Sequence, residues 1–260
     1  MIVKGRAISP GIAKGRVVRL DDAFSFLGGV EASTGDLKVA EGKNIAGKVF
    51  VFPKGKGSTV GSFVMYDLMV HGKAPAAVIN REAETIVTTG AVISSIPMVD
   101  RIDTDIFRDG DTVSVNGTDG TISIENVRYV RTVSSMIVVD GRILVLHRPD
   151  NAKSFPGRHS LVSGKIEGGE TPLEAARREV MEETQIAVGK PDAVLDPQYI
   201  REGDVLWEVT AFRFDLAWAN PVLNCENTAF EWLAIEDLCK DSKAVTKVCE
   251  TAKRLAGIKK

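Results

Sequence analysis

The sequence predicts an α/β protein with two domains, and three observations support this fold class. With 260 residues, the chain is long enough to bury two separate hydrophobic cores. Short apolar runs that are typical of buried strands occur together with helical patterns in both halves. All three cysteines and all three tryptophans lie in the second half, so the composition changes along the chain. We expect one domain over residues 1–126 and another over residues 127–260.

The first half predicts a layered β/α domain. Three apolar and partly β-branched runs are expected to be strands, namely Gly15–Leu20, Ala46–Phe52 and Ala76–Asn80. Between the last two runs, a glycine-rich turn opens into a predicted helix over Val60–His71, and Glu82–Thr89 is a second helix candidate. Residues 91–100 are expected to be extended. Residues 110–124 predict a β-hairpin, because two alternating segments flank turn residues.

The second half predicts further strands around one long helix. A hairpin is expected across Asp140-Gly141, a dipeptide that is typical of tight hairpin turns. A closing helix is expected over Ala244–Leu255. The predicted strands are Val133–Val139, Arg142–Leu146, Val205–Phe214 and Phe230–Leu233.

Composition and charge restrict the class of function. Apolar content of 44% and charged content of 26% are typical of a soluble globular protein. No apolar run approaches the roughly 20 residues that span a membrane, and the N-terminal residues lack the apolar core of a signal peptide. We therefore expect a cytoplasmic protein that binds no membrane. The net charge of −2 argues against a nucleic-acid-binding surface.

The cysteines predict no disulfide and no metal centre. Cys225, Cys239 and Cys249 are widely spaced and lack the paired spacing of a zinc or iron–sulfur site. Because the chain has no secretion signal, we expect three reduced thiols rather than a disulfide framework. Each cysteine is expected to be a buried structural residue.

The segment Gly164–Ile186 gives the strongest functional signal, and its first residues define the start of a helix. Thr171 is suited to the N-cap and Pro172 to the first helical position. Glu174 completes the sequence pattern of a capping box with Thr171. We therefore expect a helix that begins after Thr171.

Three carboxylates share one part of this helix. At about 3.6 residues per turn, Glu179, Glu182 and Glu183 fall within an arc of about 100°. Like charges at these spacings repel one another unless a cation lies among them. Carboxylate oxygens on a rigid helix suit Mg²⁺ or Mn²⁺, particularly when substrate phosphates supply further ligands. The alternative interpretation is a solvated acidic face of the helix.

Glycine and charged residues recur in this segment at a fixed spacing: Gly164, then Glu170 after five residues, Arg178-Glu179 after seven more, the apolar Val180, and Glu182-Glu183. This pattern resembles the Nudix box of hydrolases that cut nucleoside diphosphates linked to another group. The sequence departs from the motif at Gln185, where the usual residue is glycine, and the expected apolar residue Ile186 follows. The resemblance implies a Nudix α/β/α sandwich with metal-dependent diphosphate hydrolase activity, but the substrate stays open.

The resemblance also implies roles for individual residues. Glu179, Glu182 and Glu183 are the implied metal ligands. Glu179 and Glu182 are taken as catalytic, and the spacing leaves open which glutamate accepts the proton. Arg178 is expected to orient a catalytic glutamate through an ion pair, and Glu170 to brace the loop before the helix. The alternative for both is a surface salt bridge, which would contribute little.

Three other residues of the second half are weaker candidates. Glu226 lies where related proteins often have a further acidic residue. His147 and His159 flank the loop on the substrate side, and both are more typical of loop histidines than of ligands.

A glycine-rich turn in the first half is a second candidate site. In KGKGSTVGS, glycines flank small hydroxyl residues just before a predicted helix, and the turn contains Lys54 and Lys56. Backbone N–H groups at a helix start, together with nearby lysines, favour anion binding. The alternative is a plain N-cap in which Ser58 or Thr59 satisfies free N–H groups.

Four segments of the first half resemble one family. One of them is residues 51–100, which contain this turn. The further segments are KGRAISPGIAKGRVVRL, GGVEASTG and GDTVSVNGTDGTISI. Together they look like the small subunits of aconitase X-type enzymes, which include the small subunits of archaeal phosphomevalonate dehydratases. The resemblance covers residues 1–125. It implies a swivelling β/β/α domain that closes over a large subunit, with which it forms a heterodimer.

The resemblance implies a dehydration reaction and a cofactor held by the partner. The large subunit would carry a [4Fe–4S] cluster whose open iron binds the hydroxyl and carboxylate of the substrate. The first cysteine of this chain is Cys225, so the first domain cannot supply a thiolate-bound cluster. The implied substrate is (R)-5-phosphomevalonate, and the product is trans-anhydromevalonate 5-phosphate, an intermediate of the archaeal mevalonate pathway of isoprenoid synthesis.

Within this family, a serine of the glycine-rich motif removes a proton from the carbon next to the carboxylate. The matching position is Ser62, and the neighbouring Ser58 is a candidate for substrate binding. A hydroxyl can act as a base only as an alkoxide held by preorganised N–H donors with a cation nearby. Lys54 and Lys56 could supply this charge or bind a phosphate or carboxylate, and the alternative is that both are solvated.

Three functions for the whole chain remain possible at this point. The chain could combine a dehydratase small subunit with a working Nudix hydrolase, and we take this as the principal hypothesis. It could instead be a Nudix hydrolase with a docking module at its N-terminus. In the third hypothesis, the Nudix domain is a non-catalytic sensor that regulates the dehydratase.

Overall fold

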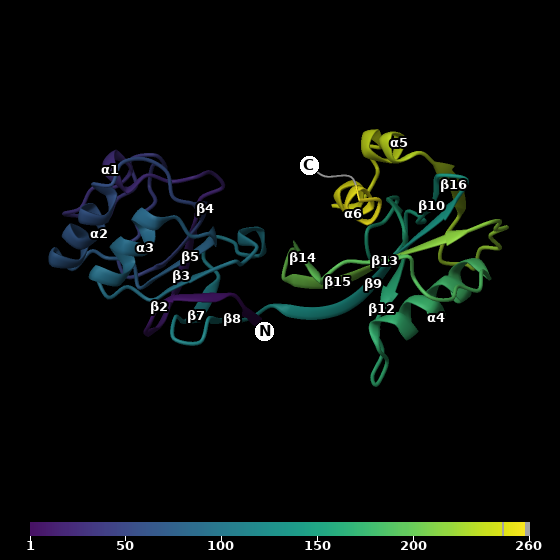
Figure 1. Ribbon diagram of the computed structural model, residues 1–260, viewed down its shortest axis with the longest axis horizontal. Coiled ribbons are helices and arrows are strands. Elements are labelled where there is room, and N and C mark those ends of the chain that lie inside the picture. The colour runs from purple at the N-terminus through teal and green to yellow at the C-terminus, as the bar shows by residue number, and fades with distance from the viewer. Residues whose placement is uncertain (246, 258–260) are drawn as a thin grey trace. The chain divides into compact units, whose positions relative to one another are not determined.

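The computed structural model describes residues 1–245 and 247–257, and it divides into two compact units, Met1–Arg128 and Tyr129–Lys260. Each unit contains its own eight-stranded sheet (Figure 1). Among the described residues, no helix is long and apolar enough to cross a membrane.

The first unit has a mixed sheet with the strand order β1-β8-β7-β3-β4-β5-β6-β2. The four strands from β3 to β6 run parallel to one another, and the remaining pairs are antiparallel. The strands are β1 (Ile2–Lys4), β2 (Arg6–Ser9), β3 (Ile12–Arg19), β4 (Val49–Lys54), β5 (Ala77–Glu82), β6 (Met98–Asp100), β7 (Thr112–Asn116) and β8 (Thr121–Ile124).

The helical segments of this unit are short. They are α1 (Phe26–Gly29), α2 (Gly61–Val70), α3 (Thr85–Ile93) and the 3₁₀ turn η1 (Thr104–Ile106). The expectation of an extended chain from residue 91 was wrong, because α3 continues to Ile93 and buries Val87, Gly90 and Ala91 on its inner face. Gly90 allows close packing on α2, since a Cβ there would lie 2.4 Å from the sulfur of Met65.

The core of the first unit contains four phenylalanines. Phe50 and Phe52 come from β4, and Phe24 and Phe26 come from the segment before α2. Their ring centroids lie between 4.7 Å and 6.1 Å apart, mostly in edge-to-face arrangements, which aromatic rings prefer. This cluster supports β4 just before it leads into the glycine-rich turn at residues 55–61.

The second unit has an antiparallel sheet with the central order β11-β10-β9-β15-β13. In addition, β12 pairs with β9, β14 with β15, and β16 with β10. The strands are β9 (Arg128–Val139), β10 (Arg142–His147), β11 (His159–Ser160), β12 (Val162–Lys165), β13 (Ala193–Val194), β14 (Gln198–Glu202), β15 (Val205–Leu216) and β16 (Ala229–Leu233). The predicted hairpin is confirmed, because Asp140 and Gly141 both have positive φ between β9 and β10.

Alternate residues of β9 and β10 bury themselves on opposite faces of this sheet. Met136 and Val138 pack with residues of α5 (Ile235–Lys240) and α6 (Val248–Leu255). Ile137 packs with Val180 of α4 (Pro172–Thr184). Because strand side chains alternate between faces, α4 covers one face and α5 with α6 covers the other. Figure 1 shows these layers, which form the expected α/β/α sandwich.

Helix α4 begins as the sequence predicts. Thr171 is the N-cap, and the reciprocal hydrogen bonds of a capping box join it to Glu174. The helix ends at Gln185, which adopts φ +55° and ψ +19° and donates its N–H to the carbonyl of Met181. This left-handed conformation favours glycine. Gln185 therefore takes the backbone conformation for which the motif normally uses glycine.

The expectation of three reduced, buried cysteines was wrong. Cys239 and Cys249 form a disulfide with 4.9 Å between their Cα atoms, and Cys225 is exposed. The disulfide forms because α5 and α6 pack against each other, which the sequence spacing did not reveal. The closing helix begins at Val248 rather than at Ala244, which instead forms a β-bridge with His159; Thr246 lies outside the described residues.

Candidate functional site

The second unit contains a cavity of about 670 Å³. Its lining includes the carboxylates of Glu179 and Glu182 from α4 and that of Glu226 from the connection before β16. The aromatic side chains of Phe155 and Trp207 also line it, with ring centroids 6.1 Å apart. The cavity therefore combines an acidic wall with an apolar, aromatic region.

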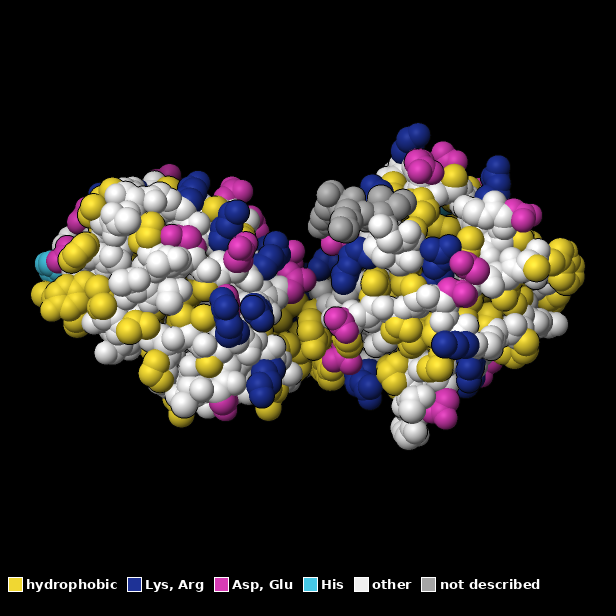
Figure 2. Space-filling model, in the orientation of Figure 1, with side chains coloured by type: hydrophobic (Ala, Val, Ile, Leu, Met, Phe, Trp, Pro, Cys, Tyr) yellow, Lys and Arg dark blue, Asp and Glu magenta, His cyan; other side chains and the backbone are white. Residues whose placement is uncertain are grey.

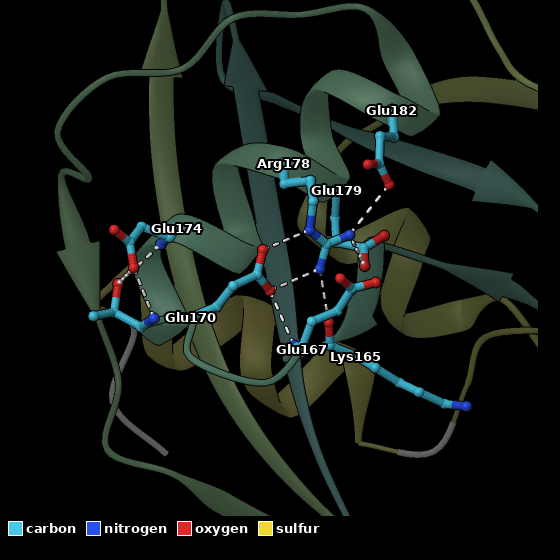
Figure 3. A network of polar contacts seen from close by, with 8 residues as sticks. Lys165, Glu167, Glu170, Glu174, Arg178, Glu179 and Glu182 are labelled. Carbon is cyan, nitrogen blue, oxygen red and sulfur yellow. Dashed lines mark hydrogen bonds and ion pairs between the residues drawn. The ribbon is translucent and has the colours of Figure 1, made fainter.

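Arg178 is the centre of a dense ionic network on α4 (Figure 3). Its Nε donates to Oε1 of Glu170 over 2.7 Å, and its Nη2 donates to Oε2 of the same carboxylate over 3.0 Å. Its Nη1 donates to Glu179 over 2.8 Å and to Glu182 over 3.2 Å. This bidentate grip lowers the pKa of Glu170 to about 2. A cation thus does lie among the carboxylates, and it is the guanidinium of Arg178.

Glu170 also holds the loop before α4. Its Oε2 accepts a hydrogen bond from the backbone N–H of Glu167 over 3.0 Å. Arg178 adds a second tie, because its Nη2 donates to the carbonyl of Lys165 over 2.9 Å. The loop between β12 and α4 is therefore fixed from the helix side by charged groups (Figure 3).

Gly164 makes room for the carboxylate of Glu179. A Cβ on Gly164 would lie 1.8 Å from the carboxyl carbon of Glu179, so any side chain at this position would displace that carboxylate. Burial raises the pKa of Glu179, and the repulsion from Glu182 and Glu226 acts in the same direction, whereas Arg178 opposes it. Glu182 is exposed. The glycine of the motif therefore leaves the space that the carboxylate of Glu179 occupies.

Glu183 lies apart from the other two glutamates of the helix. It does not line the cavity, and only 3% of its surface is exposed. Its Oε2 accepts a hydrogen bond from Nδ2 of Asn227 over 2.8 Å. Burial raises the pKa of Glu183 to about 7. The structure therefore brings Glu179 and Glu182 together around Arg178, whereas Glu183 is buried beside them and bonds to Asn227 instead.

The donor atoms of this region fit a hard divalent cation in their chemistry. Glu179, Glu182, Glu183 and Glu226 offer only carboxylate oxygens, which Mg²⁺ and Mn²⁺ prefer. Burial is the main cause of the raised pKa of Glu179 and of Glu183, and repulsion between the carboxylates adds to it. As they stand, no three such side chains in the described part of the chain are gathered closely enough to hold a metal ion. Metal binding therefore requires the carboxylates to rearrange relative to Arg178.

The two histidines of the second unit pair with each other rather than with the carboxylates of α4. The rings of His147 and His159 stack with centroids 3.8 Å apart. His159 contacts Asp241 through Nδ1 over 2.7 Å, and His147 contacts Glu231 over 2.7 Å. Burial lowers the pKa of His147. Neither histidine lines the cavity, and the expectation of loop histidines was wrong, because His147 ends β10 and His159 begins β11, where the two residues pair across the strands.

In the first unit, Ser62 lies in the first turn of α2 and is 7% exposed. Its hydroxyl donates to the carbonyl of Thr59 over 2.9 Å. The N–H groups of Gly61 and Ser62 are directed to the carbonyls of Ser58 and Thr59. Ser58 is exposed, and its Oγ accepts a weak hydrogen bond from the N–H of Val60 over 3.3 Å. The alternative of a plain N-cap at Ser58 or Thr59 was wrong, because Val60 is the N-cap of α2 and the contact of Ser58 belongs to the turn before it.

Lys54 and Lys56 are exposed at the end of β4 and in the following turn. Within residues 1–245 and 247–257, neither lysine forms an ion pair. Two lysines without acidic partners next to the serines leave this end of the sheet open to an anionic molecule.

Sequence reasoning missed Asn227 and the aromatic pair Phe155 and Trp207. Asn227 directly follows Glu226, but nothing in the sequence indicates that it reaches Glu183 on α4. Phe155 and Trp207 come from segments far apart in the chain, so only the fold brings them to one cavity. The one signal that the sequence offered for Asn227 was its position, because it is a polar residue between Glu226 and a predicted strand.

Comparisons with known proteins cover both units. Residues 2–124 match the family model of the aconitase X swivel domain, and residues 128–251 match that of the NUDIX domain. The phosphomevalonate dehydratase small subunit of Methanocella arvoryzae is 51% identical over 131 residues, which represent 48% of this chain and 99% of that protein. The small subunit of Methanosarcina mazei is 54% identical over 129 residues, which represent 46% of this chain and 89% of that protein.

Two solved structures are similar to the two halves. The holo-form of aconitase X from Thermococcus kodakaraensis has 50% identity and a TM-score of 0.47, and the match covers 48% of this chain and 98% of that chain. The MutT protein from Methanosarcina mazei has 23% identity and a TM-score of 0.48, and the match covers 52% of this chain and 97% of that chain.

The two sheets and the two family matches define a protein with a swivel domain followed by a Nudix domain. Relatives with about half of their residues identical match the first domain over nearly their whole length. The chain belongs to the aconitase X small-subunit family, which includes the small subunits of phosphomevalonate dehydratases, and its second half is a Nudix domain.

Proposed function

We propose that this chain is the small subunit of a phosphomevalonate dehydratase and that its Nudix domain is a metal-dependent diphosphate hydrolase. The dehydratase part rests on one observation, the 51% identity to a dehydratase small subunit over 99% of that protein. The reaction would remove water from (R)-5-phosphomevalonate to give trans-anhydromevalonate 5-phosphate. The large subunit would supply the [4Fe–4S] cluster, because the swivel domain has no cysteine.

In this proposal, Ser62 accepts the proton from the carbon next to the substrate carboxylate. In the structure, its hydroxyl donates to Thr59, and the nearby N–H groups already have carbonyl partners. An alkoxide at Ser62 would therefore lack stabilising donors in this chain alone. The geometry favours a base that becomes active only when the partner subunit adds donors or positive charge. Ser58, Lys54 and Lys56 would then contact the phosphate or the carboxylate of the substrate.

The hydrolase part rests on the acidic wall of the cavity, where Glu179, Glu182 and Glu226 meet a space of about 670 Å³. Glu179, Glu182 and Glu183 would hold Mg²⁺ or Mn²⁺, which would supply Lewis-acid polarisation of the diphosphate when bound. Arg178 would keep Glu179 oriented and Glu170 would hold the loop. Glu179 and Glu182 are the groups available to take the proton of the attacking water, because both line the cavity.

A direct test of the dehydratase proposal compares the chain with and without a cysteine-bearing large subunit under anaerobic conditions. We expect no conversion of 5-phosphomevalonate by the isolated chain and turnover by the reconstituted heterodimer. Product formation is followed by mass spectrometry. Conversion by the isolated, metal-free chain would show that Ser62 does not depend on the partner and would contradict the proposal.

One observation favours a second candidate function for the Nudix domain. Arg178 already neutralises Glu179 and Glu182, and among the described residues no three ligands stand ready for a metal. This arrangement suits a domain that binds a phosphorylated ligand and regulates the dehydratase without turnover. A screen of nucleotide, sugar and isoprenoid diphosphates with Mg²⁺ or Mn²⁺ separates the two functions. Metal-dependent turnover supports the hydrolase, and binding without turnover supports the sensor.

A further inference from the structure

Asn227 and Glu183 form a buried pair that joins two distant segments of the Nudix domain. Nδ2 of Asn227 donates to Oε2 of Glu183 over 2.8 Å, and the two residues are 7% and 3% exposed. Glu183 belongs to α4, whereas Asn227 lies in the connection that leads to β16. The bond therefore ties that connection to the helix that carries the Nudix glutamates.

Glu183 depends on this bond for its orientation. Among the described residues, Asn227 is the only side chain that hydrogen-bonds Glu183. Arg148 acts on Glu183 only through its field and forms no ion pair with it in the described part of the chain. A buried carboxylate with a single donor is held in the direction that this donor sets. Removal of the donor would leave Glu183 without a fixed direction.

The carboxamide of Asn227 is satisfied at one end only. Its Oδ1 is buried and has no hydrogen-bond partner in the described part of the protein. Leaving a buried acceptor unpaired costs free energy, and most buried polar atoms avoid it. A residue that served only to fill space at this position could be apolar. The donor that Asn227 presents to Glu183 is the interaction that explains an asparagine here.

We propose that Asn227 is a positioning residue of the Nudix site, which holds one oxygen of Glu183 so that the other stays available to a divalent cation. This inference rests on the proposed metal-dependent function of the domain. Oε1 of Glu183 has no hydrogen-bond partner among the described residues. Groups that orient a metal ligand typically change metal affinity by about 10-fold to 100-fold when they are removed.

The test measures Mn²⁺ binding to the full chain by electron paramagnetic resonance, with no substrate present. We expect Asn227→Ala to weaken Mn²⁺ binding by about 10-fold to 100-fold. Asn227→Leu fills a similar volume but has no donor, so it should weaken binding to a similar extent. If Asn227→Leu binds Mn²⁺ like the wild type, the residue serves packing alone and the proposal is wrong.

A double-mutant cycle tests whether Asn227 acts through Glu183. In the Glu183→Gln background, Asn227→Ala should cause no further loss of Mn²⁺ affinity, because the ligand that it positions is gone. Two losses that simply add would overturn the proposal. The matched control is Asn220→Ala, an exposed asparagine in the same connection, which should bind Mn²⁺ like the wild type.

The experiment distinguishes a wrong role for Asn227 from a wrong assignment of the metal-dependent function. A wild-type chain that binds no Mn²⁺ contradicts the metal-dependent function itself. Normal binding by wild type and by both Asn227 variants contradicts only the positioning role. If the variants do not fold, the side-chain NH₂ resonances of Asn227 in the wild type give the answer. They should shift with Mg²⁺ at the concentration that saturates the site, and unchanged resonances would overturn the proposal.

Discussion

Ser62 and Glu182 are both candidate catalytic groups on a helix, but their surroundings differ. At α2, the hydroxyl of Ser62 and the adjacent N–H groups bond to carbonyls of the same turn, and the exposed Lys54 and Lys56 lie in the segment before the helix. At α4, Arg178 joins Glu170, Glu179 and Glu182 within one network beside a cavity that the second unit lines alone. Ser62 therefore has few polar side chains around it, whereas Glu182 belongs to a network of several charged side chains.

The surface around α2 adds to this contrast. Phe63, Tyr66 and Val70 are exposed on the helix, with Phe63 at 69% of its full accessibility. Figure 2 shows hydrophobic side chains on the surface of the first unit. Exposed apolar surface of this kind is typical of a face that another protein covers. Under the proposed function, the swivel domain would need a partner to complete its site, whereas the Nudix domain would use residues of its own cavity, and the predictions for Ser62 and Glu182 test this difference.

The largest effect is expected from Ser62→Ala in the assembled heterodimer. Loss of the proposed proton acceptor should lower kcat of dehydration by about 10²-fold to 10⁴-fold, whereas metal-dependent hydrolysis by the Nudix domain should not change. Steady-state assays of both reactions on one preparation give the two numbers. Turnover near the wild-type value in the assembled mutant complex would move the role of base to another group, with Ser58→Ala as the next variant to measure.

The reverse effect is expected from Glu182→Gln. This change removes one charge from the acidic wall, so diphosphate hydrolysis should fall on the order of 10²-fold. Dehydration by the heterodimer should stay nearly constant, because Ser62 belongs to the other domain. Glu182 is exposed, so little change in stability is expected, and a thermal melt serves as the control. Loss of dehydration in a well-folded complex would show that the two domains are coupled.

A smaller effect, confined to the stability of the Nudix domain, is expected from loss of the Cys239–Cys249 disulfide. The two cysteines are separated by 10 residues, and closing a loop of this size contributes about 3 kcal/mol in the chain-entropy description. The double variant Cys239→Ser, Cys249→Ser should lose about this much in denaturant unfolding of the full chain. Cys225→Ser is the matched control, since Cys225 is free and exposed. Equal stability of the two variants would contradict the prediction.

Local sequence signals predicted local structure well in the second unit. The capping box at Thr171 and the turn at Asp140-Gly141 each depend on a few adjacent residues, and both are present. The predicted end of α3 was wrong because Ala91 is buried where α3 packs against α2, a contact that no local pattern contains, whereas Val92 and Ile93 are exposed. Helix and strand compete closely for such a short apolar run, and packing decides between them.

The candidate sites could be predicted only in part, because local patterns locate residues on a helix but do not show which distant residues they contact. The spacing of Glu179, Glu182 and Glu183 placed them on α4, but it could not show that Glu183 is buried and does not line the cavity. Nor could it show the hydrogen bond from Asn227 to Glu183, because the two residues are 44 positions apart in the chain. The disulfide of α5 with α6 likewise depends on how two helices pack. The residues that share one helix could be predicted from the sequence, whereas bonds between distant segments could be identified only from the fold.

The smallest predicted effect concerns the residue at which α4 ends. Gln185 has φ +55°, and its side chain is exposed, so a glycine would relieve the left-handed backbone without loss of a buried contact. The gain is partly offset because glycine makes the unfolded chain more flexible. We expect Gln185→Gly to stabilise the Nudix domain by about 0.5–1 kcal/mol, measured by denaturant unfolding, and to leave the swivel domain unchanged. Gln185→Ala, which keeps a Cβ, should give no such gain. Destabilisation by Gln185→Gly would show that the side chain has a role that the strained backbone conceals.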